Sequence, residues 1–493
     1  MVDWTSGLLE SGAAASGGGF GSLLWLAEAA SEAELEPLVF ASVLLSLVVI
    51  YFSAKLGGEI CARINLPPVL GELVAGVVVG ISALHLVVFP GEAAGEASSL
   101  LMKLVGLTSG LEPAGIFSVF RSESEVISVL AELGVVILLF EIGLESDLKE
   151  LIRVGPQAAV VAVVGVAVPF AAGTAGLIAL FGVPTIPAVF AGAALTATSI
   201  GITAKVLAEL QRLSSREGQI IIGAAVLDDV LGIIVLAVVA SLAKTGEIQI
   251  ANVIYLIIGA TIFLVGSIFL GRLFSPYFVA VVDQLRTRGQ VIISSLIFAF
   301  VLSYVAAAIQ LEAILGAFAA GLILAETSKR KELEEQISPI ADILVPIFFV
   351  TVGARTDIGV LNPLDPANRE GLIIASFLVV VAILGKVVTG FVVFGQPGIN
   401  RLAVGVGMIP RGEVGLVFAG VGSASGVLSE SLDAAIIVMV ILTTFLAPPL
   451  LRVVFRDEPE VALEDAPSLA EATVSEVISG STTPAQPESS ETT

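Results

Sequence analysis

Two adjacent carboxylates, Asp228 and Asp229, lie in the middle of an otherwise apolar run over residues 223–236. A charged side chain at the centre of a bilayer costs about 2.5–3.5 kcal/mol on insertion scales, so such residues are rare and mark ion pathways. Two neighbouring carboxylates therefore predict a site that binds a cation, a proton or both. The alternative is a polar contact between packed helices.

A single lysine, Lys386, is the natural partner for this pair. It is the only charged residue in the apolar run 382–390, and a buried ammonium needs an opposite charge. Adjacent helical residues point about 100° apart, so one aspartate can meet another helix while the other faces a cavity. The sequence therefore predicts an ion pair between Lys386 and one of the two aspartates. A purely structural ion pair is the alternative.

Two further apolar runs contain residues that disfavour a continuous helix. One carries Thr196, Thr198 and Ser199, and the other carries Pro410, which lacks a backbone N–H. Interruptions at corresponding places in two halves of a chain are typical of transporter binding sites. The alternative for the hydroxyls is a bond back to a carbonyl one turn earlier.

Two charged residues, Arg411 and Glu413, follow this proline. The ends of half-helices carry partial charges, positive at the N-terminus and negative at the C-terminus. Arg411 and Glu413 are therefore expected to stabilise exposed helix ends, and this local role is favoured over direct binding.

The chemistry of such a site follows from its oxygen atoms. Carboxylate and hydroxyl oxygens suit a hard cation, and a carboxylate also accepts a proton. Competition between Na⁺ and H⁺ for one site gives exchange without any further coupling device. The residues therefore predict a secondary transporter that exchanges Na⁺ or Li⁺ for H⁺, and not an enzyme.

These residues require membrane-spanning helices to position them. Of 493 residues, 56% are hydrophobic and 14% charged, whereas soluble domains carry about 25% charged residues. Composition predicts an all-α polytopic membrane protein, and apolar runs of helix length predict about thirteen transmembrane helices. The expected spans are 38–56, 66–89, 126–144, 154–181, 187–210, 219–243, 253–270, 291–309, 311–325, 341–353, 371–394, 402–421 and 432–454, the ninth and tenth being short enough to be tilted or broken.

The interrupted spans have opposite orientations, so two inverted six-helix repeats with crossed discontinuous helices fit the pattern. We expect an extracytoplasmic N-terminal segment (1–37), a membrane domain (38–454) and a disordered acidic cytoplasmic tail (455–493). Lys and Arg concentrate in one set of alternate loops. By the positive-inside rule this places the N-terminus outside and the C-terminus in the cytoplasm of a cell membrane.

Charge and cysteine usage set further bounds. The formal net charge is −22, which we interpret as an adaptation to a high-salt habitat, with two acidic tails as the alternative. Cys61 and His85 are the only residues of their kinds. An intrachain disulfide and a histidine-rich metal site are therefore excluded.

An ordered set of motifs resembles the monovalent cation:proton antiporters, in particular the NapA-type electrogenic Na⁺/H⁺ branch, over nearly the whole chain between its two tails. The motifs are LPPVLGELVAG (66–76), LLFEIGLE (138–145), ATSIG (197–201), LDD (227–229), LGAFAAG (315–321), PIFFV (346–350) and PRGEVG (410–415).

The resemblance implies a homodimer in a lipid bilayer, with a dimerisation domain and a core domain that moves as an elevator. It implies that Asp229 is the main carboxylate for Na⁺ and H⁺, and that Asp228 pairs with Lys386. Thr198 and Ser199 would line the site at the crossing. A role in pH homeostasis, no cofactor and no nucleic-acid partner are expected.

Four alternatives stay open or are disfavoured by particular residues. The electroneutral branch carries Asn-Asp where this chain has Asp228-Asp229, which favours electrogenic exchange. K⁺/H⁺ exchange is the main alternative, and a Na⁺-coupled solute symporter of the same fold is a weaker one. An intramembrane aspartyl protease needs its two aspartates on separate helices, which the adjacent pair does not provide.

Overall fold

The computed structural model describes residues 20–90, 99–245, 250–362, 364, 368–395 and 398–456. The expected cytoplasmic tail lies outside the described residues from position 457 onward, and the expected N-terminal segment does so up to position 19. Their predicted properties therefore stay predictions.

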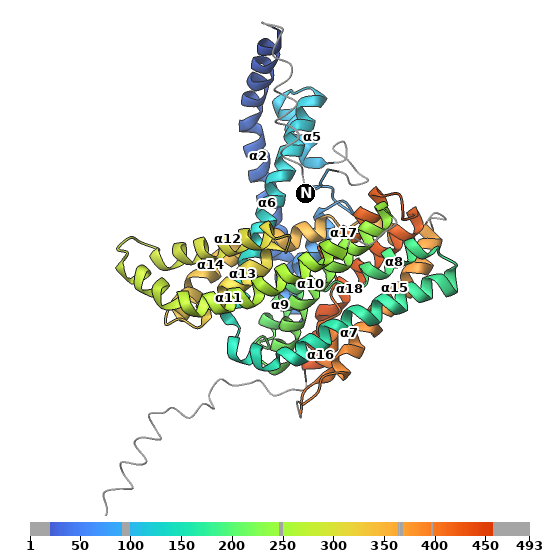
Figure 1. The fold of residues 1–493 in the computed structure, drawn as a ribbon. Helices are drawn as coiled ribbons and strands as arrows, with labels where there is room; N and C mark the ends of the chain where they lie inside the picture. Colours follow the sequence, from blue (N-terminus) through green and yellow to red (C-terminus); the bar gives the residue numbers. More distant parts are fainter. Residues whose placement is uncertain are drawn as a thin grey trace, which may run out of the picture. The chain divides into compact units, whose positions relative to one another are not determined.

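The described residues form α-helices and one short 3-10 helix, η1, with no strands among them, so the predicted all-α fold is confirmed. Figure 1 shows these elements along the chain. The helices are α2 (Phe20–Arg63), α3 (Pro68–Val79), α5 (Leu100–Ser109), α6 (Pro113–Glu145), α7 (Leu148–Phe181), α8 (Thr185–Ala194), α9 (Ile200–Glu209), α10 (Arg216–Thr245), α11 (Ile250–Gln284), α12 (Gln290–Ala308), α13 (Ala313–Ala325), α14 (Arg330–Ala354), η1 (Ile358–Leu361), α15 (Asn368–Phe391), α16 (Arg401–Gly407), α17 (Glu413–Ala424) and α18 (Glu430–Phe455).

Within the described ranges, nine helices are long and apolar enough to cross a membrane, which makes the chain a multi-pass membrane protein. Helices α3 and α13 are shorter apolar helices. Two further pairs, α8 with α9 and α16 with α17, fall where the interrupted spans are expected. If each pair and each short helix crosses once, the predicted thirteen spans result, and this number stays a prediction.

Several spans differ from expectation. Helices α2, α6 and α11 extend well beyond the expected spans 38–56, 126–144 and 253–270. Two other differences, in the second and tenth spans, have a clear local cause. The second ends early, because α3 stops at Val79 and Gly80 is extended. A Cβ at Gly80 would lie 2.3 Å from the backbone of Ala354, so this close approach needs a glycine and turns the chain. The tenth span is neither short nor broken, because α14 extends from Arg330 to Ala354. The charged residues in its first turns lower the local hydropathy, so a hydropathy pattern places the start of this helix too late.

The helices pack into two groups. Helices α2, α3, α6, α12, α13 and α14 pack mainly against one another, and α7, α8, α10, α15, α16, α17 and α18 form the second group. Helix α9 lies between the groups, because it contacts α3 and α6 as well as α10 and α18. The two groups therefore meet along a seam beside the broken helices.

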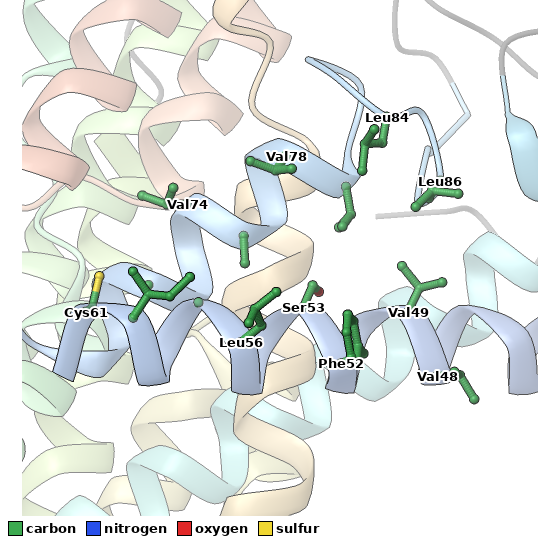
Figure 2. A pocket seen from close by; sticks show the side chains of 15 residues that line it. Val48, Val49, Phe52, Ser53, Leu56, Cys61, Val74, Val78, Leu84 and Leu86 are labelled. Atoms are coloured by element: carbon green, nitrogen blue, oxygen red, sulfur yellow. The ribbon is translucent and has the colours of Figure 1, made fainter. Parts of the chain in front are cut away.

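Glycines set how closely the helices approach. Helices α2 and α3 touch at Gly57 and Gly71, where a Cβ on either residue would lie 2.0–2.2 Å from the other's carbonyl oxygen. An apolar groove of about 490 Å³ lies beside this contact, lined by side chains such as Phe52 and Val78 (Figure 2). Both side chains are exposed, so the groove opens to the surface of the chain.

Polar caps begin several helices at the points that the sequence would suggest. The side chain of Asp147 accepts hydrogen bonds from the backbone N–H groups of Lys149 and Glu150 at the start of α7. Asn400 accepts one from Ala403 at the start of α16. Such caps satisfy backbone donors that have no partner within the helix, and they fix where α7 and α16 enter the second group.

Candidate cation and proton site

Both interrupted segments are real breaks in helices. Helix α8 ends at Ala194 and α9 begins at Ile200, while α16 ends at Gly407 and α17 begins at Glu413. Helices α8 and α17 contact each other, and α10 contacts the four half-helices. The unwound stretches therefore lie against α10, the helix that carries the two aspartates.

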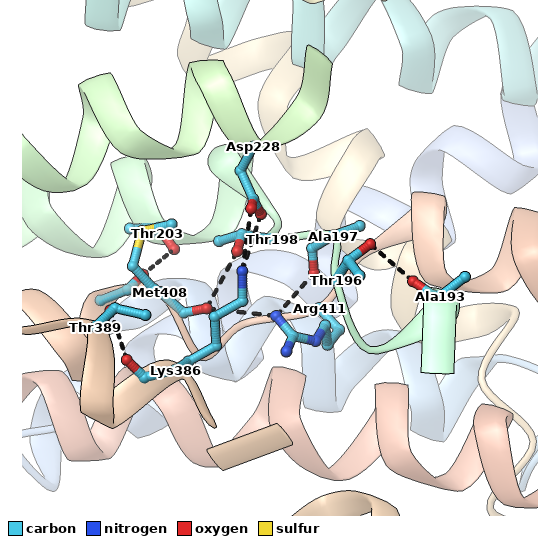
Figure 3. Close-up of polar contacts among 11 residues, drawn as sticks. Ala193, Thr196, Ala197, Thr198, Thr203, Asp228, Lys386, Thr389, Met408 and Arg411 are labelled. Carbon is cyan, nitrogen blue, oxygen red and sulfur yellow. Dashed lines mark hydrogen bonds and ion pairs between the residues drawn. The ribbon is translucent and has the colours of Figure 1, made fainter. Parts of the chain in front are cut away.

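Hydrogen bonds join the two breaks directly (Figure 3). The backbone N–H of Ser199 donates to the carbonyl of Pro410 over 2.8 Å. The hydroxyl of Thr198 donates to the carbonyl of Met408 over 3.2 Å, across 210 positions of sequence. The hydroxyl of Thr196 instead bonds locally, to Ala193 over 2.7 Å. The hydroxyl of Thr196 therefore bonds within its own segment, whereas the hydroxyl of Thr198 bonds across to the other broken helix.

A fully buried arginine, Arg411, connects the ends of both broken helices. Its Nη1 donates to the carbonyl of Ala197 over 2.8 Å and to that of Met408 over 3.4 Å. These carbonyls follow the C-terminal ends of α8 and α16, which carry partial negative charge. The geometry is that expected of a helix-end stabiliser. The side chain of Glu413 lies outside the described residues, so its role stays a prediction.

The structure brings Lys386 of α15 to Asp228 of α10. Its Nζ lies 3.2 Å from Oδ1 and 3.1 Å from Oδ2 of Asp228, and both side chains are fully buried. A Cβ at Gly165 of α7 would lie only 3.2 Å from this Nζ. Gly165 therefore leaves the space that the ammonium fills, which the sequence pattern does not reveal.

The second carboxylate, Asp229, lies in the same helix and is 3% exposed. Ser199 is 8% exposed, and a Cβ on Gly412 would lie 2.7 Å from its hydroxyl oxygen. The six predicted residues whose side chains are described are all buried at or near the crossing: Asp228, Asp229, Thr198, Ser199, Lys386 and Arg411.

Two hydroxyls that sequence reasoning did not select also hold the crossing. Thr203 of α9 donates to the carbonyl of Gly407 over 2.9 Å. Thr444 of α18 donates to the carbonyl of Arg411. Thr444 belongs to a pair of adjacent threonines in an apolar span, and two neighbouring hydroxyls there could have indicated a buried polar contact. The partner carbonyls could not be identified before the crossing itself was known.

The oxygen atoms at the crossing suit a small hard cation. Carboxylates, hydroxyls and backbone carbonyls converge there, and such oxygens are preferred by hard cations. Among the described residues, no cluster of three or more His, Cys, Asp or Glu side chains could hold a metal ion.

Comparison with known families and relatives gives consistent matches. Residues 43–456 match the profile of a family described as sodium/hydrogen exchanger, transmembrane. The chain is 68% identical to the high-affinity Na⁺/H⁺ antiporter NhaS3 of Synechocystis sp., covering 89% of this chain and 94% of the relative. It is 31% identical to the Na⁺/H⁺-K⁺ antiporter GerN of Bacillus cereus, covering 83% and 95%.

A solved structure has the same fold. The sodium proton antiporter MjNhaP1 from Methanocaldococcus jannaschii, solved at pH 8, superposes with a TM-score of 0.55 at 15% sequence identity. The match covers 86% of this chain and 97% of that one. At this identity the likeness is one of architecture.

Proposed function

The chain belongs to the sodium/hydrogen exchanger family, and we propose that it exchanges Na⁺ for H⁺ across a membrane at the buried carboxylate Asp229. Family membership agrees with the resemblance to monovalent cation:proton antiporters that the motifs indicate. The observation that carries the proposal is the set of four buried charges at the crossing: Asp228, Asp229, Lys386 and Arg411. The names of the relatives support the choice of Na⁺ and H⁺.

The balance of these four charges accounts for exchange. With both carboxylates ionised, two negative charges face two positive ones, so the set is formally neutral. One bound proton or one bound Na⁺ adds a single positive charge. Both together would add two in a buried site, where uncompensated charge is expensive. Na⁺ and H⁺ therefore exclude each other, which is the requirement for exchange at one site.

The two aspartates have separate roles in this proposal. Asp228 is held by Lys386 over 3.1 Å, so its charge is compensated. Asp229 then offers the carboxylate that binds Na⁺ or H⁺. Thr198 supplies a further ligand, because its proton is donated to Met408 and its oxygen lone pairs stay available to a cation. Ser199, at the end of the same break, is the second hydroxyl ligand.

The experiment is dissipation of a pH gradient in everted vesicles on addition of Na⁺. The wild type should respond, and Asp229→Asn should not respond while it keeps its folded yield and melting behaviour. Asp283→Asn is the matched control, because it removes a partly exposed carboxylate that pairs with Lys329, between the end of α11 and the start of α14. A normal response of Asp229→Asn would overturn the assignment.

The cation series in the same assay decides between Na⁺ and K⁺. One observation favours K⁺ as a second candidate: GerN, at 31% identity, is named a Na⁺/H⁺-K⁺ antiporter. We propose that Na⁺ and Li⁺ elicit the response at lower concentrations than K⁺, since the relative at 68% identity is named for Na⁺ and H⁺ alone. An equal or stronger response to K⁺ would select the second candidate.

We also propose that exchange is electrogenic and that Lys386 is the reason. If the Lys386–Asp228 pair opens during the cycle and Lys386 releases its proton, more than one proton moves per Na⁺. Voltage then drives transport at about 2.3 kcal/mol per charge per 100 mV. Na⁺ flux in proteoliposomes under a K⁺-diffusion potential, without a pH gradient, tests this. A wild type that ignores the potential is electroneutral, and a Lys386→Gln variant that responds like the wild type leaves Lys386 a structural ion pair.

The division into two helix groups supports elevator movement within a homodimer. The group with Lys386 and both breaks would move, and the group with α2 and α12 would form the dimer scaffold. Large apolar side chains, Phe52 on α2 at 69% and Tyr304 on α12 at 75%, are exposed on those two helices. We place the N-terminus outside and the C-terminus in the cytoplasm of a cell membrane, with pH homeostasis as the role of the exchange.

A further inference from the structure

A cavity of about 210 Å³ lies on the seam between the two helix groups. Helices α3, α6 and α14 form one wall, and α18 forms the other. Gly412 and Thr444 line its inner end. Gly412 packs against the hydroxyl of Ser199, and Thr444 bonds the carbonyl of Arg411. The cavity therefore ends against the crossing that holds the proposed cation site.

A buried hydroxyl inside this cavity has no hydrogen-bond partner in the described part of the chain. Thr351 of α14 is 4% exposed, and its Oγ1 bonds neither backbone nor side chain there. A buried polar atom without a partner is costly, and in a native protein it points to water or a ligand. Thr351 thus offers a hydrogen-bonding group to water or to a hydrated cation that enters the cavity.

The mouth of the cavity is held by Arg355, the residue that follows α14. Its Nη2 donates to the hydroxyl of Ser128 on α6 over 2.6 Å. Its guanidinium lies 4.3 Å from the centre of the Phe89 ring. Arg355 and Ser128 also line a second, more open cavity together with Glu125. The two residues therefore form the partition between the more open outer cavity and the narrower inner cavity.

Helix capping alone does not explain this arrangement. Arg355 is the C-cap residue of α14, and a cation there is favoured by the partial negative charge of the helix end. That role needs only a charge near the last carbonyls. It does not need the bond to Ser128 or the ring of Phe89, which draw the guanidinium across to α6 and to the segment after α3.

We propose that Arg355 is the gate of the outer route to the cation site, with its positive charge slowing the entry of cations past Ser128. The identity of the cation as Na⁺ and the outer side of the route rest on the proposed function and topology, whereas the sign of the gate's charge does not. Acidic groups also face the route: Glu132 lines the inner cavity and Glu125 the outer one. They attract cations to the partition at which Arg355 opposes them.

The test measures access to Thr351 without measuring transport. A Thr351→Cys, Cys61→Ala protein reacts from the outer side with a cationic or an anionic thiosulfonate reagent. Adding Arg355→Ala should speed the cationic reagent about three- to tenfold, the effect of one charge at several ångströms in a partly hydrated cleft. The anionic reagent should not speed up. High ionic strength should shrink the difference, because exposed charges are screened.

Lys103→Ala is the matched control, because Lys103 is an exposed cation on α5 that lines neither cavity. It should change neither rate. Arg355→Lys keeps the charge and should stay close to wild type for the cationic reagent. Equal acceleration of both reagents by Arg355→Ala, or no acceleration, would overturn a charge gate. A cysteine at 351 that reacts only from the inner side would overturn the route.

A transport measurement separates this inference from the proposed function. In proteoliposomes, Arg355→Ala should lower the outer-side KM for Na⁺ about three- to tenfold with kcat little changed. If the wild type shows no Na⁺-driven proton movement while the labelling result holds, the gate stands and the proposed exchange fails. If exchange is normal and the KM is unchanged, the gate fails and the exchange stands.

Discussion

Removing either charge of the buried ion pair between Asp228 and Lys386 should destabilise the protein strongly. Removing both charges together should lower the free energy of unfolding by less than the sum of the two single effects. At 3.1 Å, two unit charges attract each other by about 5 kcal/mol at an effective dielectric constant of about 20. Removing one partner leaves the other charge buried and unpaired, which costs about 3–5 kcal/mol. Asp228→Asn and Lys386→Met should each lower the free energy of unfolding by about this amount.

The double variant removes both charges, so no uncompensated charge remains. Methionine retains most of the lysine stem and fits the space that Gly165 leaves open. The loss in the double variant should therefore be smaller than the sum of the single losses by about 3 kcal/mol or more. The assay is reversible unfolding of the purified protein by SDS in mixed micelles, followed by circular dichroism, for all four members of the cycle.

A second cycle on Asp283 and Lys329 is the control. This pair has nearly the same length, 2.9 Å, but its side chains are 54% and 23% exposed, so water compensates each charge. Its coupling should fall within the error of the measurement. If the Asp228–Lys386 losses add like those of the exposed pair, burial does not give that ion pair its strength, and the argument for a charge-balanced site fails with it.

Three other outcomes follow from the structure. A Cβ at Gly390 would lie 1.7 Å from the carbonyl oxygen of Arg401, so Gly390→Ala should push α15 from α16, lower stability by about 1–3 kcal/mol and abolish exchange. Gly259→Ala is the control, because a Cβ at Gly259 of α11 has nothing within 4 Å, and it should be neutral or stabilising by about 0.5–1 kcal/mol. Equal effects of the two variants on stability would contradict close packing at Gly390. In a Cys61→Ala background, a cysteine at Arg330 should react with impermeant reagents from the cytoplasmic side only, because basic loops stay inside, and outside labelling would refute the topology. Native mass spectrometry from mild detergent should record a dimer, and a monomer with full activity would refute the scaffold role of α2 and α12.

The sequence indicated the candidate site because polar residues are conspicuous in apolar spans. Lys386 is alone in its run, so a buried partner had to exist, and Asp228 is that partner. Pro410 lacks the backbone N–H that a helix interior needs, and the hydroxyl of Thr198 competes with the hydrogen bonds of a helix. Both residues fall in breaks. Placing each such residue inside a membrane costs considerable free energy, so its presence in an apolar span indicates a specific partner or a break in the helix.

Tertiary contacts between helices were not predictable in the same way. The carbonyls that accept from Thr203 and Thr444 lie on helices whose crossing cannot be read from one segment. The early end of α3 depends on the approach of Gly80 to Ala354, which involves two distant parts of the chain. The bond between Arg355 and Ser128 likewise requires α6 and α14 to be neighbours.

The hydrogen bonds between the two breaks have a consequence for protein engineering. The backbone N–H of Ser199 donates to the carbonyl of Pro410, and the hydroxyl of Thr198 donates to the carbonyl of Met408. Each unwound stretch therefore helps to fix the conformation of the other. A chimera that imports one stretch from a distant relative would pair a foreign donor pattern with native acceptors. Recombination libraries should therefore exchange the two stretches together, as one inherited module, although about 210 positions separate them in the chain.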